Sequence, residues 1–233
     1  MKSKPQYTQD GSRTLYSEHY AQTFHSDKGA VTESKHVFLQ ASGVAERLQR
    51  GERAAVLEVG FGTGLNFFIT ADFALKNKAP LHFVSLEQTL LPASTVKELG
   101  FERYLKAPVL ERYLSFREGL PNRVEAGKYD LELGDGVGLE LRVGDATEQT
   151  FSENTFDAVY QDAFSPDANP ELWTDTFFDR LYRALKPGCV LTTYSVKGEV
   201  RRRLQRLGFT VEKRPGPPGG KREMLWARRS PQS

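Results

Sequence analysis

The chain is poor in cysteine and has no long apolar run. Its 233 residues include a single cysteine, Cys189, so no disulfide can form within the chain. No stretch approaches the roughly 20 consecutive apolar residues that a membrane-spanning helix needs. The first ten residues are too polar for a secretory signal. We therefore expect a cytoplasmic protein with no membrane partner.

Histidine is also scarce, and the net charge is small. The four histidines, at positions 19, 25, 36 and 82, lack the spacing of metal ligands, and we expect no metal site. The formal net charge is only +2, but basic residues greatly outnumber acidic ones between positions 197 and 229. Such a surplus suits a polyanion such as RNA. A solvated helix face would explain it equally well.

Length and composition predict one α/β domain. A chain of 233 residues with 39% hydrophobic residues is long enough for a sizeable core. We expect a disordered tail over residues 1–13 and a single domain over 14–233. Within that domain we expect an N-terminal extension over 14–50 and an insertion containing a hairpin over 108–138.

Apolar runs alternate with stretches of helical periodicity. This alternation predicts a doubly wound, mostly parallel sheet with an antiparallel last strand. Strands are expected at 54–60, 81–86, 129–133, 137–143, 156–161, 190–195, 209–213 and 223–227. Helices are expected at 65–76, 93–105, 170–185 and 198–207, with another ending near Gly43.

The most informative motif runs from Val56 to Asn66, with the sequence VLEVGFGTGLN. Its three alternating glycines, Gly60, Gly62 and Gly64, fall on a strand-to-helix turn, where glycine lets a ligand approach the main chain. A dinucleotide fingerprint would need glycine at position 65, which is leucine. The pattern instead resembles the first motif of class I S-adenosylmethionine (SAM) methyltransferases. A tight turn without a ligand is the alternative.

Two further acids are expected at strand ends. Glu87 ends the second strand, where a carboxylate can accept hydrogen bonds from both hydroxyls of a ribose. Asp145 follows a later strand and is placed to bind the exocyclic amine of adenine, with the Ala146 amide on a ring nitrogen. Each acid alone could be a helix cap or a surface residue. Together with the glycine loop they predict a SAM site.

A second unusual loop runs from Asp162 to Trp173 and is rich in aromatic residues and proline. Asp162 ends a strand and can orient or deprotonate a nucleophile. Phe164 and Trp173 can form the wall of a pocket. The alternative is an Asx-type turn before a helix, with Trp173 in the core.

Taken along its length, the chain resembles the tRNA wobble-uridine methyltransferases of the MnmC/MnmD type, which methylate the amine of 5-aminomethyl(-2-thio)uridine at position 34. The motif around the three glycines is the least specific part of the resemblance. The other matching blocks are 17–20, 29–39, 162–166, 169–173, 185–188, 193–195, 200–202, 207–209 and 219–224.

The resemblance and the strand-end pattern together give the site residues that we expect. Asp162 is the expected catalytic residue. The expected cofactor-binding residues are Glu33, Glu58, Gly60, Phe61, Gly62, Thr63, Gly64, Asn66, Glu87, Gln88, Asp145, Ala146 and Asp162. The expected substrate-binding residues are Phe24, Phe164, Ser165, Pro166, Trp173, Lys221 and Arg222.

The resemblance implies SAM-dependent N-methylation of a tRNA anticodon stem-loop. Fused bacterial members carry a second, flavin-dependent oxidase domain, whereas this chain has one cofactor loop and looks like the stand-alone transferase. Two alternatives stay open. A spermidine-synthase-like aminopropyltransferase, or another small-amine transferase, would use the same sheet but would have no need of the arginine-rich C-terminal part. A non-catalytic RNA-binding protein would not need all three strand-end acids.

Overall fold

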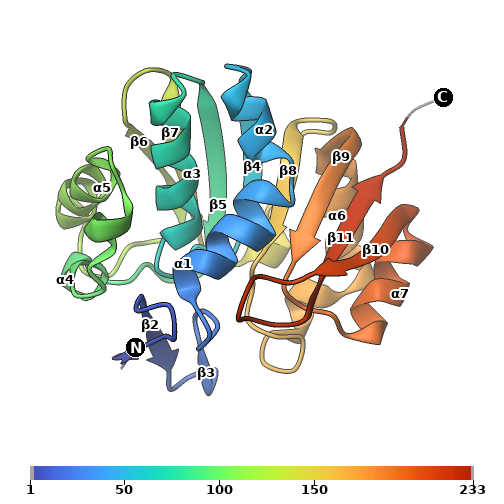
Figure 1. Cartoon of the computed structure of the whole chain (residues 1–233), viewed down its shortest axis with the longest axis horizontal. Coiled ribbons are helices and arrows are strands. Elements are labelled where there is room, and N and C mark those ends of the chain that lie inside the picture. The colour runs from blue at the N-terminus through green and yellow to red at the C-terminus, as the bar shows by residue number, and fades with distance from the viewer. Residues whose placement is uncertain (1–2, 232–233) are drawn as a thin grey trace.

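The computed structural model describes residues 3–231 and contains two sheets (Figure 1). The smaller sheet is N-terminal and has the order β1-β2-β3, made of β1 (Ser3–Tyr7), β2 (Arg13–Ser17) and β3 (Gln22–Thr23). The larger sheet has the order β10-β11-β9-β8-β4-β5-β7-β6. Its strands are β4 (Ala54–Val59), β5 (Leu81–Glu87), β6 (Gly127–Glu132), β7 (Val137–Val143), β8 (Phe156–Gln161), β9 (Leu185–Thr193), β10 (Phe209–Pro215) and β11 (Glu223–Arg229).

The helices vary in type and length. The α-helices are α1 (Ala30–Glu33), α2 (Val44–Gln49), α3 (Leu65–Lys76), α4 (Ala93–Lys97), α5 (Val109–Glu118), α6 (Asp175–Ala184) and α7 (Gly198–Arg206). A π-helical segment, η1 (Ser34–Gln40), continues α1. The 3₁₀ segments are η2 (Phe101–Tyr104), η3 (Ala146–Glu148) and η4 (Pro170–Trp173). No helix among residues 3–231 is long and apolar enough to cross a bilayer.

The topology confirms the expected doubly wound sheet. Strand β4 pairs in parallel with β5 on one side and with β8 on the other, so the strand order reverses beside β4. The last strand, β11, runs antiparallel to both β9 and β10. The expected hairpin is also present, since β6 pairs antiparallel with β7 at one edge. Ligands of such sheets bind at the carboxyl ends of the strands beside the reversal.

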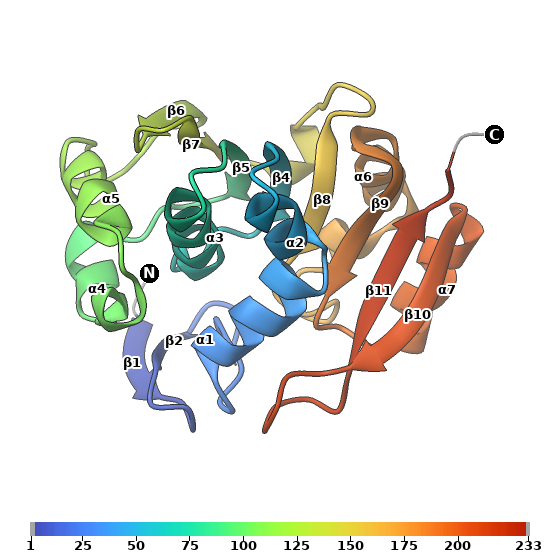
Figure 2. The same cartoon turned by 45° about the horizontal axis from the view of Figure 1, so that its top comes forward.

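The sheet carries helices on both faces (Figures 1 and 2). On one face, Leu48 of α2, Phe67 of α3 and Tyr113 of α5 belong to a single buried apolar cluster. On the other face, Leu181 of α6 and Leu204 of α7 belong to a second cluster. Helices therefore cover both faces of the sheet, which explains why β4 and β8 are nearly continuous apolar runs in the sequence.

The expectation of a disordered tail over residues 1–13 is wrong for the described part. Residues 3–7 form β1, which pairs antiparallel with β2 from Ser3 opposite Ser17 to Tyr7 opposite Arg13. Asp10 organises the connecting turn, because its Oδ1 accepts hydrogen bonds from the Thr8 hydroxyl at 2.8 Å and the Ser12 amide at 3.0 Å. The turn of this hairpin is stabilised by polar side chains. The strand could not be predicted because it carries no apolar pattern in the sequence. Residues 1–2 lie outside the described part.

Several predicted element boundaries also differ from the structure. The helix expected at 93–105 is two short pieces, α4 and η2, interrupted at Gly100, which has a φ of +66°. The helix expected at 170–185 divides at Thr174, whose hydroxyl accepts the Phe177 amide at 3.2 Å and caps α6. Strand β9 begins five residues earlier than expected, with an irregular register opposite β8 that accommodates Pro187. Helix α5 was not predicted.

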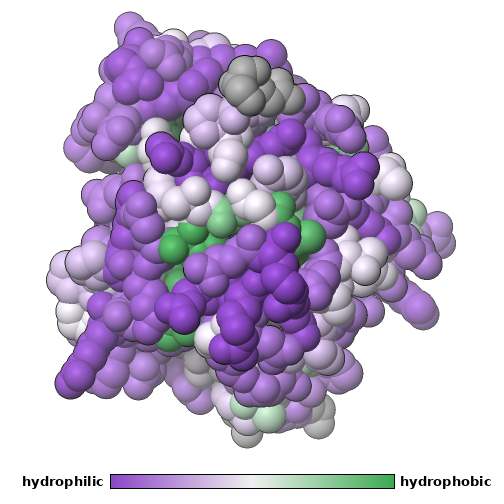
Figure 3. Space-filling model, turned by 90° about the vertical axis from the view of Figure 1, so that its right-hand side faces the viewer, coloured by the Kyte–Doolittle hydropathy of each residue, from purple (hydrophilic) through white to green (hydrophobic). Residues whose placement is uncertain are grey.

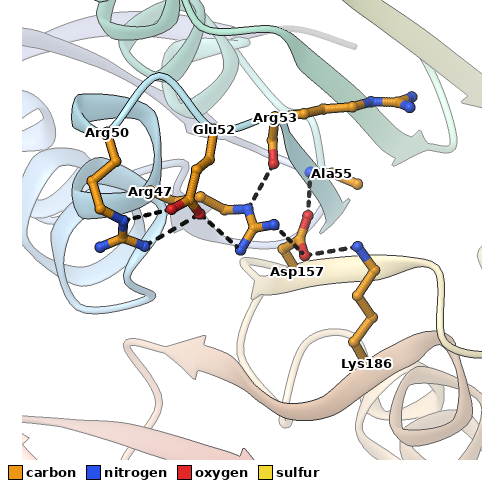
Figure 4. A network of polar contacts seen from close by, with 7 residues as sticks. All are labelled: Arg47, Arg50, Glu52, Arg53, Ala55, Asp157 and Lys186. Atoms are coloured by element: carbon orange, nitrogen blue, oxygen red, sulfur yellow. Dashed lines mark hydrogen bonds and ion pairs between the residues drawn. The ribbon is translucent and has the colours of Figure 1, made fainter.

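A polar network ties four elements together at the end of the sheet opposite the glycine loop (Figure 4). Asp157 of β8 is buried and accepts the Ala55 amide of β4 at 2.8 Å. Its other carboxylate oxygen lies 2.8 Å from the Lys186 ammonium of β9 and 3.7 Å from Arg47 of α2. The partners of this buried carboxylate come from three other elements. Asp157 therefore connects β8 to α2, β4 and β9.

Candidate active site

A cavity of about 560 Å³ opens at the carboxyl ends of β4, β5, β7 and β8. Its floor comes from the strand ends and its walls from the N-terminal extension and the loop after β8. Tyr194, after β9, and Lys221, in the β10–β11 loop, complete the lining. The cavity therefore lies at the reversal in strand order, where the sequence places the glycine loop and the strand-end acids.

The glycine loop lies close to two other segments of the chain. Gly60 has a φ of +91°, and a Cβ added there would lie 2.9 Å from the carbonyl oxygen of Asp162. Gly62 has a φ of +55°, and a Cβ there would lie 2.9 Å from the ring of Phe24. Both positions therefore need glycine for backbone conformation and for space.

Glu87 is oriented by the glycine loop itself. Its Oε2 accepts the Gly62 amide at 2.9 Å and its Oε1 accepts the Thr89 amide at 3.0 Å. Burial raises the pKa of Glu87, although these amide hydrogen bonds oppose the shift. Asp145 also lines the cavity, and its Oδ1 accepts the backbone amide and the hydroxyl of Thr147, both at 2.7 Å. Two carboxylates are thus fixed along the same wall.

Asp162 lies at the centre of an acidic group. Burial raises its pKa well above the ordinary value, and the negative charges of Glu33 and Glu58 add to the shift. Asn66 Nδ2 donates a hydrogen bond to Asp162 Oδ2 at 2.7 Å, which with the charge of Lys221 favours the ionised form. Burial likewise raises the pKa of Glu33. A carboxylate whose pKa is raised in this way is a stronger base than an ordinary aspartate and is a candidate proton acceptor.

Five of the expected site residues do not line the cavity: Glu58, Gly64, Pro166, Trp173 and Arg222. Glu58 is fully buried in β4, where its Oε2 accepts the Ser85 hydroxyl at 2.6 Å. Gly64 faces the rings of Phe61 and Phe68 instead of open space. Arg222 is exposed, and its carbonyl closes the β10–β11 loop by accepting the Gly216 amide at 2.9 Å.

Trp173 lies in the core and is not part of the pocket wall, so the expectation that it forms the wall is wrong. Its ring is fully buried against Phe178, and its Nε1 donates to the carbonyl of Phe164 at 2.8 Å. The indole satisfies its polar group and buries its apolar area at the same time. Trp173 therefore supports the loop from behind, while Phe164 and Ser165 face the cavity.

The cavity is also lined by residues that the sequence did not predict, among them Tyr20, Gln22, His25 and Tyr194. His25 connects two segments, with Nδ1 3.1 Å from the Thr14 hydroxyl and Nε2 3.3 Å from the Thr63 hydroxyl. Burial lowers its pKa to about 4, so the ring is neutral at pH 7. Tyr194 directly follows β9, and its position at a strand end is the one sequence signal that could have identified it.

The basic C-terminal side is partly neutralised within the chain. The side of the molecule carrying β10, β11 and α7 is hydrophilic over most of its surface (Figure 3). Five of its basic residues form ion pairs: Lys197 with Asp167, Arg203 with Glu199, Arg206 with Asp175, Lys213 with Glu223, and Arg214 with Glu212. Within residues 3–231 no ion pair is found for the other basic residues of this segment, which are Arg201, Arg202, Lys221, Arg222, Arg228 and Arg229. These six carry the surplus positive charge.

The cavity has the polar groups that a SAM-type cofactor would need. Asn66 Oδ1 and Ser34 Oγ are buried on its wall, and neither has a hydrogen-bond partner among the described residues. Buried polar atoms are normally satisfied, so two orphans on one wall indicate a polar ligand. Glu87 and Asp145 could hold the ribose and the adenine, and the glycine loop leaves room for the methionine part.

Comparison with known proteins gives consistent results. A family model described as S-adenosyl-L-methionine-dependent methyltransferase matches residues 115–230. Two curated relatives are both named "tRNA 5-methylaminomethyl-2-thiouridine biosynthesis bifunctional protein MnmC". The protein from Azoarcus sp. (strain BH72) is 38% identical over 229 residues, which are 95% of this chain and 35% of that protein. The protein from Cupriavidus metallidurans is 35% identical over 235 residues, which are 98% of this chain and 34% of that protein.

A solved structure matches over the whole chain. The crystal structure of MNMC2 from Aquifex aeolicus has a TM-score of 0.74 and 27% sequence identity, and the match covers 100% of this chain and 73% of that one. The chain spans about a third of the length of the curated relatives. These matches favour neither an aminopropyltransferase nor a non-catalytic RNA-binding protein. The chain belongs to the S-adenosyl-L-methionine-dependent methyltransferases and uses SAM as its methyl donor.

Proposed function

We propose that this enzyme methylates the aminomethyl nitrogen of 5-aminomethyl(-2-thio)uridine at wobble position 34 of tRNA. The observation that carries the proposal is the match of 95–98% of the chain to relatives named for 5-methylaminomethyl-2-thiouridine biosynthesis. The product would be methylaminomethyluridine. A tRNA substrate would place the reaction in the cytoplasm.

The chemistry requires a neutral amine beside an activated methyl group. SAM would supply a methyl group on a sulfonium. The amine lone pair would attack the methyl carbon in line as the carbon–sulfur bond breaks, and S-adenosylhomocysteine would leave. An alkylammonium has no lone pair and cannot attack. In our proposal Asp162 accepts a hydrogen bond from the amine, directs its lone pair and takes up the proton released after transfer. Its raised pKa suits that task, because a carboxylate with a raised pKa is a stronger base than an ordinary aspartate.

Placement would supply most of the rate enhancement. Alignment of two bound reactants can lower a barrier by about 7 to 11 kcal/mol. In this proposal Asn66 fixes Asp162 through the 2.7 Å hydrogen bond, and Glu33 closes the methionine end of the cavity. The wobble base would leave the anticodon stack, with Phe24 and Phe164 available for contact with it. The arginines without ion pairs would bind phosphates of the stem-loop.

Transfer of labelled methyl from SAM to tRNA tests the proposal. The tRNA should come from cells that lack the last step of the modification, so that the aminomethyl group is present. We expect label in this tRNA and none in tRNA that carries unmodified uridine at position 34. Polyamines offered as acceptors serve as the control for a small-amine transferase. Label in polyamines but not in tRNA would refute the proposal.

A further inference from the structure

Tyr20 and Phe164 form a stacked aromatic pair on the cavity wall. Their ring centroids lie 4.2 Å apart and the ring planes differ by 23°. Both residues line the cavity and both are half-buried. Phe164 lies two residues beyond Asp162, whereas Tyr20 comes from the turn between β2 and β3 of the N-terminal sheet. Two segments far apart in the sequence therefore meet face to face beside the expected reaction centre.

The segment that carries Tyr20 is fixed at its base. Gln22 Nε2 donates to the Ser165 hydroxyl at 2.6 Å, and Gln22 Oε1 accepts the Ser165 amide at 3.2 Å. Ala21, between the two, has a φ of +50°, a conformation that costs a non-glycine residue energy and that clusters at ligand clamps. The strained backbone at Ala21 therefore orients Tyr20 towards Phe164.

The Tyr20 ring itself is held by weaker contacts than its backbone. Its hydroxyl donates one long hydrogen bond, of 3.3 Å, to Gln88 Oε1 at the exposed side of the cavity. The exposed His19 touches its ring edge-on at a centroid distance of 4.6 Å. The third contact is the stack on Phe164. Rotation of the Tyr20 side chain would therefore break one long hydrogen bond, the edge contact with His19 and the stack, while the Gln22–Ser165 pair would stay intact.

We propose that the Tyr20–Phe164 pair is the binding site for the extruded nucleobase, which enters between the two rings. In the free enzyme, Tyr20 covers the face of Phe164 that the base will use. A planar pyrimidine that entered would exchange one aromatic stack for two. This inference rests on the proposed function, and it assigns the base to one position on the cavity wall.

The geometry favours a base over a flexible amine at this position. Phe24 contacts the Phe164 ring at a steep angle of 67°, with a centroid distance of 5.1 Å, so the nearly parallel contact comes from Tyr20. Parallel aromatic faces recognise planar rings, and every nucleobase has such a face. A saturated polyamine would gain no stacking from the pair. Asp162 and Phe164 line the same cavity, so the bound ring would share that cavity with the carboxylate.

Steady-state methyl transfer to a synthetic anticodon stem-loop carrying 5-aminomethyluridine at position 34 tests the inference. We would compare the wild type with Tyr20→Ala and Tyr20→Phe. The control is Tyr7→Ala, because Tyr7 lies in the same N-terminal sheet, is 71% exposed and does not line the cavity. The affinity for S-adenosylhomocysteine, measured by calorimetry, reports whether each variant keeps an intact cofactor site.

We expect Tyr20→Ala to raise KM for the stem-loop about tenfold or more, as measured losses for aromatic-base stacks imply. Tyr20→Phe keeps the ring and should stay within about threefold of the wild type. Tyr7→Ala should match the wild type, and cofactor affinity should be unchanged in all variants. A KM for Tyr20→Ala equal to that of the wild type would overturn the inference while leaving the proposed function standing.

Two other results are equally informative. If Tyr20→Ala loses cofactor affinity in parallel with stem-loop affinity, the ring covers the cofactor and is not a base site, and the inference is wrong. If the wild type transfers no methyl group to the stem-loop, the proposed function itself fails, and the inference falls with it.

Discussion

The substitution Glu58→Gln should make the enzyme more stable at alkaline pH. Glu58 is 0% exposed, and no cation pairs with its carboxylate among the described residues. Burial raises its pKa from 4.5 to about 8, although hydrogen bonds from Ser85 and Asn66 oppose the shift. The folded protein therefore keeps the Glu58 proton up to about pH 8, whereas the unfolded chain releases it near pH 4.5. The stabilisation that results is full below pH 4.5 and is lost as the pH rises through 8.

The size of the effect follows from the two pKa values. One pH unit between them corresponds to about 1.36 kcal/mol, so the full loss is about 5 kcal/mol. Part of that loss has already occurred at pH 6. Between pH 6 and pH 9 the wild type loses about 3 kcal/mol more. Glutamine resembles the protonated acid in shape and cannot ionise. The variant should therefore lack this component of the pH dependence.

Urea unfolding at pH 6 and at pH 9 measures the difference. We expect the free energy of unfolding of the wild type to fall by about 3 kcal/mol more than that of Glu58→Gln over this range. Glu118→Gln, which changes an exposed glutamate on α5, should follow the wild type. If the free energy of unfolding falls by the same amount in the wild type and in Glu58→Gln, Glu58 is ionised in the folded protein and the prediction is wrong.

Three further substitutions test the cavity and the basic side. Asp162→Asn should lower kcat by about 10² to 10⁴ with little change in SAM affinity, and should abolish the rise in rate that we expect of the wild type as pH increases through the raised pKa of Asp162. An unchanged kcat at saturating substrates would exclude its role as a base. Gly60→Ala should weaken SAM binding measured by calorimetry, because the new Cβ lies 2.9 Å from a carbonyl oxygen; wild-type affinity would show that the loop adjusts freely. Arg202→Ala should lower the slope of log affinity for tRNA against log salt concentration by about 1. Arg206→Ala should lower it less, because Arg206 is already paired with Asp175. Equal slopes for the two variants would show that the ion pair makes no difference to phosphate binding.

The sequence predicts those parts of the fold that depend on local patterns. Strand β4, the three glycines and helix α3 are recognisable because a buried run, a turn and a helical period follow one another within 25 residues. The acids Glu87 and Asp145 follow from the rule that ligands bind at strand ends. The antiparallel β11 follows from the position of a final apolar run after a proline- and glycine-rich turn.

The features that could not be predicted depend on contacts between distant segments. Residues 3–7 read as a polar tail, and their pairing with β2 depends on the turn around Asp10. Trp173 has the same local sequence whether it lies in a pocket wall or in the core, and the choice is made by Phe178 and the Phe164 carbonyl. Tyr20 faces the cavity because Ala21 and Gln22 direct it there, and neither residue carries a recognised motif.

The most direct test of the proposed function is the mass of the nucleoside at position 34 after incubation of the enzyme with SAM and tRNA that carries the aminomethyl group. We expect conversion of 5-aminomethyl(-2-thio)uridine to the form that carries one additional methyl group on the side-chain nitrogen, with no change at other positions. A methyl group on another nucleoside, or an unmodified position 34 in the presence of bound SAM, would contradict it.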